Sequence, residues 1–156
     1  MVLKLQEFDF LALYESTGSG ALPDLVHDVP MKGVQLVPLS DRILNFEGDV
    51  AIRMLAGVTL GYEEHKILKA LRKELRGRPY EESLLDLIKA AHDYEGEVTS
   101  EDLSSLFCSE LVAECYQRLG LLDEKKASDE YVPGDFGERA NLQLLRGHLG
   151  VEYHLS

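Results

Sequence analysis

The spacing of apolar side chains along the chain predicts both strands and helices. Runs that are apolar at nearly every position, or at every second one, predict strands over residues 8–15, 34–37 and 49–54. Apolar residues three and four positions apart predict helices over residues 62–76 and 81–92. Together these patterns predict a fold of mixed strands and helices, in the α+β class.

Two further patterns complete this prediction. Ser40 is suited to cap a short helix over residues 40–44, because a serine oxygen accepts hydrogen bonds from the free N–H groups at a helix start. Near the end of the sequence, residues 142–145 and 151–155 are expected to pair as strands around Gly147 and Gly150. The 156 residues suit a single domain, 1–156, with one core.

The pattern with the most chemical content is a helix that carries a cysteine. Ser104 or Ser105 is expected to cap this helix, and Gly120 is expected to end it. Cys108 then falls in the first turn, where the helix dipole favours the nucleophilic thiolate. The alternative is that Cys108 is a small core residue, since it shares one apolar face with Leu111, Val112, Cys115, Tyr116 and Leu119.

The two cysteines indicate a reducing compartment. Cys108 and Cys115 are seven residues apart on one predicted helix, which separates their Cα atoms by about 10 Å. A disulfide between them would require a much closer approach. Two thiols without an internal bridge predict a cytoplasmic protein. The lack of a Cys-x-x-Cys pair argues against a structural zinc site, and no metal or organic cofactor is expected.

Charge narrows the possible partners. The formal net charge of −12 argues against general nucleic-acid binding, which needs a basic surface. Basic residues nevertheless gather on the predicted 62–76 helix and just after it. They form either a solvated helix face, balanced by neighbouring glutamates, or a docking surface for an anionic lipid headgroup or an acidic partner.

Five sequence elements occur in the order found in one enzyme family. The segment Phe107-Cys108-Ser109-Glu110-Leu111-Val112 resembles the nucleophile helix of permuted papain-like enzymes, the circularly permuted branch of the NlpC-type cysteine hydrolases. The other four elements are similar to the family's acidic strand, its next strand, its Gly-x-Pro-Tyr-acid motif and its Tyr-x-Pro-x-Asp-Phe motif. They lie at residues 13–17, 33–39, 77–81 and 131–136.

This resemblance implies a fold, a reaction and site residues. The fold is α+β and papain-like, with a small antiparallel sheet packed against helices. Cys108 attacks an amide or ester carbonyl of a small-molecule, peptide or acyl substrate to form an acyl-enzyme. Glu15 takes the third role of the triad, in which it orients a histidine. Tyr80 borders the substrate site, and the backbone N–H of Cys108 helps to hold the oxyanion.

The sequence departs from the family at the catalytic histidine. In the family this histidine precedes the acidic strand in a Ser-His-Val-Gly-type stretch, and Met1-Val2-Leu3-Lys4 resembles the residues that follow it. The resemblance therefore implies a member that lacks its N-terminal segment and is inactive or weakly active as written. A separate hypothesis gives the role to His148 or His154, which follow Cys108 as in unpermuted papain-like enzymes.

Three functional hypotheses follow. The first is a cysteine amidase or peptidase. The second is a lipid acyltransferase or deacylase of the same branch, with the basic helix on the membrane side. The third is a non-catalytic binding domain that keeps the fold without the base.

Overall fold

The computed structural model describes residues 1–5, 8–18, 20–76 and 100–155, and for 100–107 it describes the backbone alone. Three strands form one antiparallel sheet in the order β1 (Val2–Lys4), β2 (Leu11–Thr17) and β3 (Gly33–Pro38). A second antiparallel pair joins β4 (Val50–Ala56) to β5 (His148–Leu155). With the helices around them, these sheets confirm the predicted α+β class.

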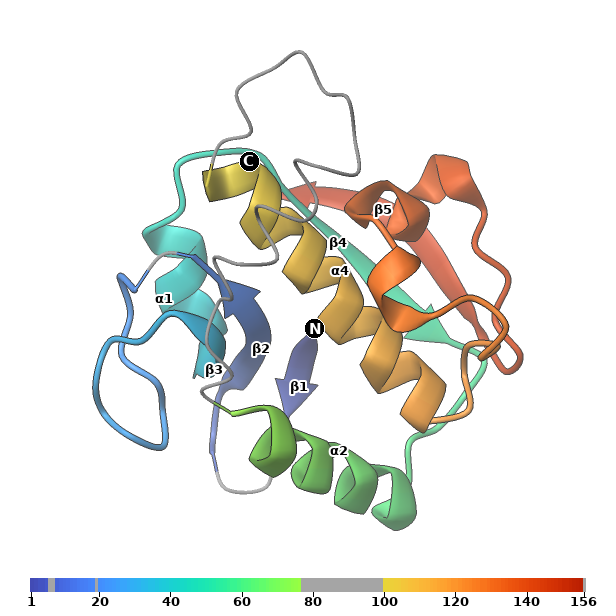
Figure 1. The fold of residues 1–156 in the computed structure, drawn as a ribbon, viewed down its shortest axis with the longest axis horizontal. Helices are drawn as coiled ribbons and strands as arrows, with labels where there is room; N and C mark the ends of the chain where they lie inside the picture. The colour runs from blue at the N-terminus through green and yellow to red at the C-terminus, as the bar shows by residue number, and fades with distance from the viewer. Residues whose placement is uncertain (6–7, 19, 77–99, 156) are drawn as a thin grey trace.

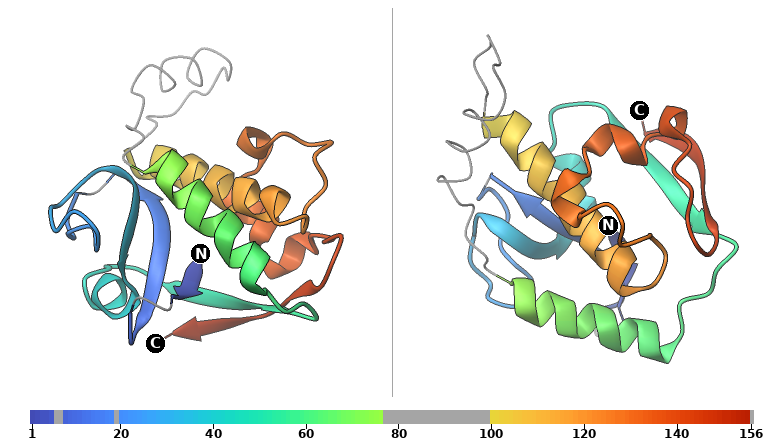
Figure 2. Two further views of the ribbon diagram at one scale, coloured as in Figure 1. Left: turned by 90° about the horizontal axis from the view of Figure 1, so that it is seen from below. Right: turned by 45° about the vertical axis from the view of Figure 1, so that its right-hand side comes forward.

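The helices lie on both sides of the three-stranded sheet (Figures 1 and 2). The short helix α1 (Leu39–Leu44) lies on one face, as the left view of Figure 2 shows. The longer helices α2 (Tyr62–Leu75) and α4 (Ser100–Arg118) lie on the other face. Three short 3₁₀ turns follow α4 at η1 (Ser128–Glu130), η2 (Pro133–Phe136) and η3 (Glu138–Ala140).

The main core lies between the three-stranded sheet and the two longer helices. Alternation along β2 turns Ala12, Tyr14 and Ser16 toward α4, and each of these residues is buried. The helices contribute the buried side chains of Leu68, Leu71, Leu75, Leu111 and Cys115, and the buried Leu119 follows directly after α4. Burial of apolar side chains from several elements is the main stabilising contribution to this arrangement.

Several predicted elements are confirmed with shifted ends. The 34–37, 40–44, 49–54 and 62–76 predictions correspond to β3, α1, β4 and α2. Gly120 ends the cysteine helix as expected, because its φ of 64° is favourable for glycine. The strand predicted over 8–15 begins at Leu11 and continues to Thr17. The helix predicted over 81–92 lies outside the described residues.

Two predictions are wrong. Residues 142–145 do not pair with 151–155; instead β5 pairs with β4, with Ile52 opposite Tyr153. Hydrophobic patterns mark strands but do not specify partners about a hundred residues apart, which explains this error. Ser40 does not cap α1, because the N-cap position is Pro38, and the Ser40 hydroxyl donates to Asp41 Oδ1 at 3.0 Å.

No described helix combines the length and apolar character that crossing a bilayer requires.

Candidate active site around Cys108

Cys108 lies farther inside its helix than the sequence predicted. Helix α4 begins at Ser100, so Cys108 is its ninth residue rather than a member of the first turn. Ser100 followed by two acidic residues is a typical helix start. Ser104 and Ser105, which were expected to cap the helix, are also compatible with positions inside it. The expected benefit of the helix dipole for the thiolate is therefore absent, because that effect is confined to the first turn.

This position also removes the predicted oxyanion donor. Only the first four N–H groups of a helix are without an intrahelical acceptor. The backbone N–H of Cys108 follows them and belongs to the regular hydrogen-bond ladder of α4. An oxyanion formed at this thiol would therefore need other donors.

The Cys108 thiol is half-buried at the edge of β2. Its Sγ donates a hydrogen bond to the backbone carbonyl of Ser16. Burial is the largest influence on the thiol and raises its pKa above the ordinary value. Burial also raises the pKa of Cys115, to about 12, and that residue has no exposed surface. Cys108 is thus the more accessible thiol, but it needs a base to become a nucleophile at neutral pH.

The strand register explains why the thiol meets this particular carbonyl. Met1 and Tyr14 exchange two backbone hydrogen bonds, each 2.8 Å long, across the β1–β2 pair. Alternation points the backbone groups of Ser16, two residues further along β2, toward the same side. β1 has no residue opposite Ser16, and the Ser16 carbonyl oxygen accepts its hydrogen bond from the Cys108 thiol instead. A strand residue opposite Ser16 would share the face of β2 that packs on α4.

Glu15 does not have the expected geometry. The third role in a triad requires Glu15 to point toward the Cys108 end of the helix, with space between the two side chains for an imidazole. Its side chain instead lies on the opposite face of β2 from Ser16, where it contacts Arg42 of α1. The two residues are neighbours in β2, but alternation separates their side chains, so the structure does not bring Glu15 and Cys108 together as parts of a triad.

The partners of Glu15 are a guanidinium and an amide. Arg42 Nε donates to Glu15 Oε2 at 3.0 Å, and Arg42 Nη2 donates to Oε1. Gln35, the cross-strand partner of Glu15, donates from Nε2 to Oε1 at 2.8 Å. Sequence analysis missed Arg42 and Gln35, although a carboxylate ending an apolar strand already required partners. The catalytic assignment of Glu15 stays a prediction, and its contacts are those of a structural ion pair.

The described histidines lie on separate elements of the chain rather than together at Cys108. His65 belongs to α2, where its Nδ1 lies 2.7 Å from the carbonyl oxygen of Gly61. His148 and His154 belong to β5, which pairs with β4. Within the described part of the chain, no hydrogen bond joins a histidine ring to the Cys108 thiol.

The segment after α4 braces the helix next to Cys108. The buried Ser109 hydroxyl donates to the carbonyl oxygen of Tyr131 at 2.6 Å. Asp135 Oδ2 accepts hydrogen bonds from Lys126 Nζ at 2.8 Å and from the backbone N–H of Val132 at 3.0 Å. These bonds, that of Lys126 first, hold the pKa of the Asp135 carboxyl below its ordinary value. The Tyr-x-Pro-x-Asp-Phe motif is therefore a fixed support behind the cysteine helix.

Neither the predicted role of Tyr80 nor the comparisons with known proteins identify a further residue of the site around Cys108. Tyr80, together with the rest of the 77–81 motif, lies outside the described residues. Among the residues that are described, no group of three or more His, Cys, Asp or Glu side chains is placed to hold a metal ion. Comparison of the chain with protein-family models, with curated proteins and with solved structures finds no match.

Proposed function

We propose that this chain is a cysteine hydrolase-type domain of permuted papain-like architecture, with Cys108 as the nucleophile toward an amide or ester carbonyl. The observation that carries the proposal is the position of the thiol. It is half-buried and reaches the edge of β2 at the Ser16 carbonyl, beyond the end of β1. The small antiparallel sheet packed against the cysteine helix supports the proposed architecture.

Because its pKa is raised, Cys108 needs a general base before it can react. At neutral pH the residue is mainly a thiol, so a histidine must take its proton. The resulting thiolate attacks the carbonyl carbon and forms a thioester, while the imidazolium returns the proton to the departing amine or alcohol. The imidazole then deprotonates a water molecule, which attacks the thioester and releases the acid and the free thiol.

The strand register gives a position for this histidine. A residue two positions before Met1 in a longer β1 would stand opposite Ser16, on the face that packs against α4. Its backbone N–H would donate a hydrogen bond to the Ser16 carbonyl in place of the Cys108 thiol, and the thiol would then be able to contact the imidazole. Histidine at either neighbouring position would point to the other face, because strand side chains alternate.

The test is a set of N-terminal extensions that place one histidine one, two or three residues before Met1. We expect only the second position to accelerate hydrolysis of p-nitrophenyl acetate, by roughly a hundredfold or more over the unextended chain. Alanine in place of that histidine, or Cys108→Ala, should return the rate to the background. Equal rates for all three extensions would contradict the proposal.

A non-catalytic binding domain is the second candidate. The observation that favours it is the Glu15–Arg42 pair, which engages the carboxylate expected to serve the histidine. If the second extension gives no thioester and no rate increase while remaining folded, this candidate is preferred. The lipid acyltransferase or deacylase hypothesis shares the thioester step and differs in the acyl donor, so a phospholipid ester tested with the same extension distinguishes it.

A further inference from the structure

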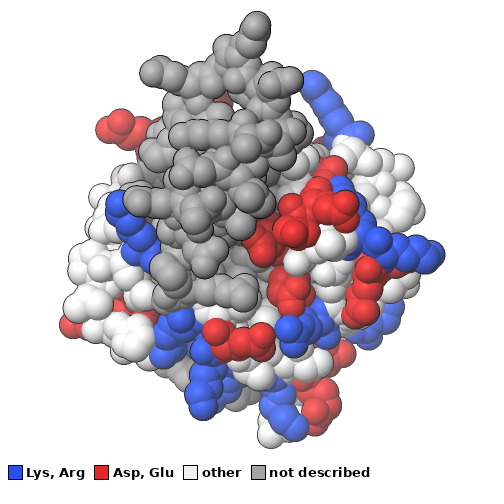
Figure 3. Space-filling view, in the orientation of Figure 1, with Lys and Arg blue, Asp and Glu red and all other residues white. Residues whose placement is uncertain are grey.

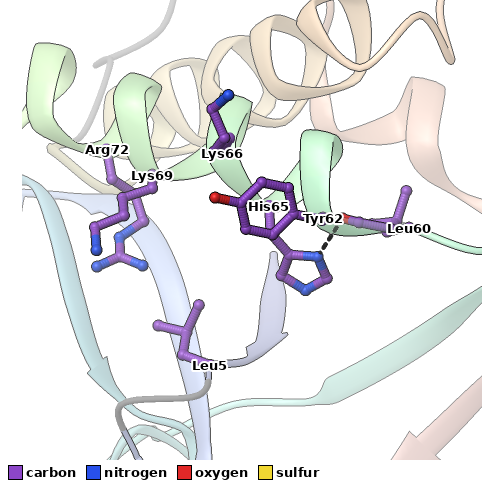
Figure 4. Close-up of a pocket in the computed structure, with 8 residues that line it drawn as sticks. Leu5, Leu60, Tyr62, His65, Lys66, Lys69 and Arg72 are labelled. Carbon is purple, nitrogen blue, oxygen red and sulfur yellow. Dashed lines mark hydrogen bonds between the residues drawn. The ribbon is translucent and has the colours of Figure 1, made fainter.

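We propose that the cavity between α2 and the end of β1 binds a soluble phosphomonoester whose organic part is apolar. The cavity has a volume of about 650 Å³, which is in the range of small-molecule sites. It is lined by Leu5 on one side, and on the other by Leu60, just before α2, and by residues of α2 itself (Figure 4). This site is independent of the proposed chemistry at Cys108.

The cationic residues of α2 provide the charge for the phosphate. Lys66, Lys69 and Arg72 are spaced three residues apart, so they follow one side of the helix, and all three line the cavity. In Figure 4 the side chains of Lys69 and Arg72 extend in the same direction, toward the level of Leu5. Lys66 turns away and pairs with Glu63 at 3.3 Å. Because both side chains line the cavity and extend toward Leu5, Lys69 and Arg72 are the principal anion ligands of the proposed site.

Local charge contrasts with the charge of the whole chain. The net charge is −12, and Figure 3 shows acidic side chains interspersed with basic ones over the α2 region. Among the described residues that line the cavity, however, every side chain with a fixed charge is basic. A phosphomonoester carries nearly two negative charges at neutral pH, which matches one lysine and one arginine. The planar guanidinium of arginine is also suited to two parallel hydrogen bonds with phosphate oxygens.

The apolar part of the ligand has its own contacts. Tyr62 presents an aromatic ring at the cavity, and Leu5 and Leu60 provide aliphatic surface. Aromatic and aliphatic lining with a few polar groups is typical of sites for small organic ligands. A soluble source is favoured over a membrane lipid, because the net negative charge of the protein opposes approach to an anionic bilayer.

Isothermal titration calorimetry with phenyl phosphate tests this site. Lys69→Gln and Arg72→Gln should each weaken binding by about tenfold, since each removes a charge-assisted hydrogen bond. Lys73→Gln is the matched control, because Lys73 is an exposed residue of the same helix outside the cavity lining. Phenol and inorganic phosphate should each bind more weakly than phenyl phosphate, because each lacks half of the recognised group.

Circular dichroism of each variant separates lost binding from lost folding, and Lys69→Gln alone decides the test if Arg72→Gln does not fold. Equal affinities for Lys69→Gln and the control, or no binding of phenyl phosphate by the unaltered chain, would overturn the proposal. Binding to vesicles containing phosphatidic acid without binding of phenyl phosphate would also overturn it, in favour of a lipid source. Failure of the Cys108 chemistry would leave all these results unchanged.

Discussion

Replacement of Arg42 by methionine should destabilise the fold more than loss of a surface ion pair would. The side chains of Arg42 and Glu15 are only 15% and 12% exposed, and the guanidinium contacts both carboxylate oxygens. Removing one member of a buried pair typically costs about 3–5 kcal/mol, because the other charge stays without compensation. Gln35 still donates to Glu15 in this variant, so we expect the lower value, about 3 kcal/mol.

Urea denaturation followed by circular dichroism measures this loss, which corresponds to a decrease of about 6 to 12 °C in Tm for a chain of this size. Glu15→Gln is the comparison variant, and it should cost less, because the long Arg42 side chain can extend its charge to water. The double variant should be more stable than Arg42→Met alone, since it has no unpaired carboxylate. If Arg42→Met costs less than about 1 kcal/mol, the pair behaves as a surface salt bridge and the argument from burial is wrong.

Three other measurements test the environment of single groups. Limited iodoacetamide labelling with peptide mapping should modify Cys108 before Cys115, because Cys115 has no exposed surface and its pKa is raised to about 12; preferential labelling of Cys115 would contradict this. Tyr14→Phe should be neutral or stabilising at pH 7, because the buried hydroxyl has no hydrogen-bond partner among the described residues. Burial also raises the pKa of Tyr14, so above about pH 10 this tyrosine ionises more readily in the unfolded state. The unaltered protein should therefore lose stability with rising pH faster than Tyr14→Phe does, and parallel profiles of stability against pH would refute this. Asp135→Asn should be destabilising at pH 7. The difference in stability between this variant and the unaltered protein should shrink as pH falls through the folded-state pKa of Asp135, which lies below 3.8. A difference in stability that persists at that pH would argue against the Lys126 contact.

Local patterns were sufficient to predict most of the described helices and strands. The three- and four-residue spacing in α2 identified Leu68, Leu71 and Leu75, and all three are buried. Ile67 belongs to the same apolar pattern but is 38% exposed, because it lies at the margin of that face. The spacing of apolar residues indicates which side of a helix is apolar, and residues on that side are buried where it packs against the core.

Long-range contacts could not be predicted in the same way. The β4–β5 pairing joins segments about a hundred residues apart, and the contact of Arg42 with Glu15 spans 27 residues. The start of α4 was also missed, because serine is compatible with both a cap and a helix interior. Cys108 could therefore be singled out from the sequence, but neither its depth in the helix nor its contact with the Ser16 carbonyl could be predicted.

The most direct test of Cys108 as a nucleophile is to trap its acyl-enzyme. The extension with histidine two residues before Met1 is mixed with p-nitrophenyl acetate, quenched in acid and mapped by peptide mass spectrometry. The account predicts an acetyl thioester on the peptide that contains Cys108, and much less of it with histidine one or three residues before Met1. Acetylation at Cys115, or acetylation of Cys108 to the same extent in all three extensions, would contradict the account.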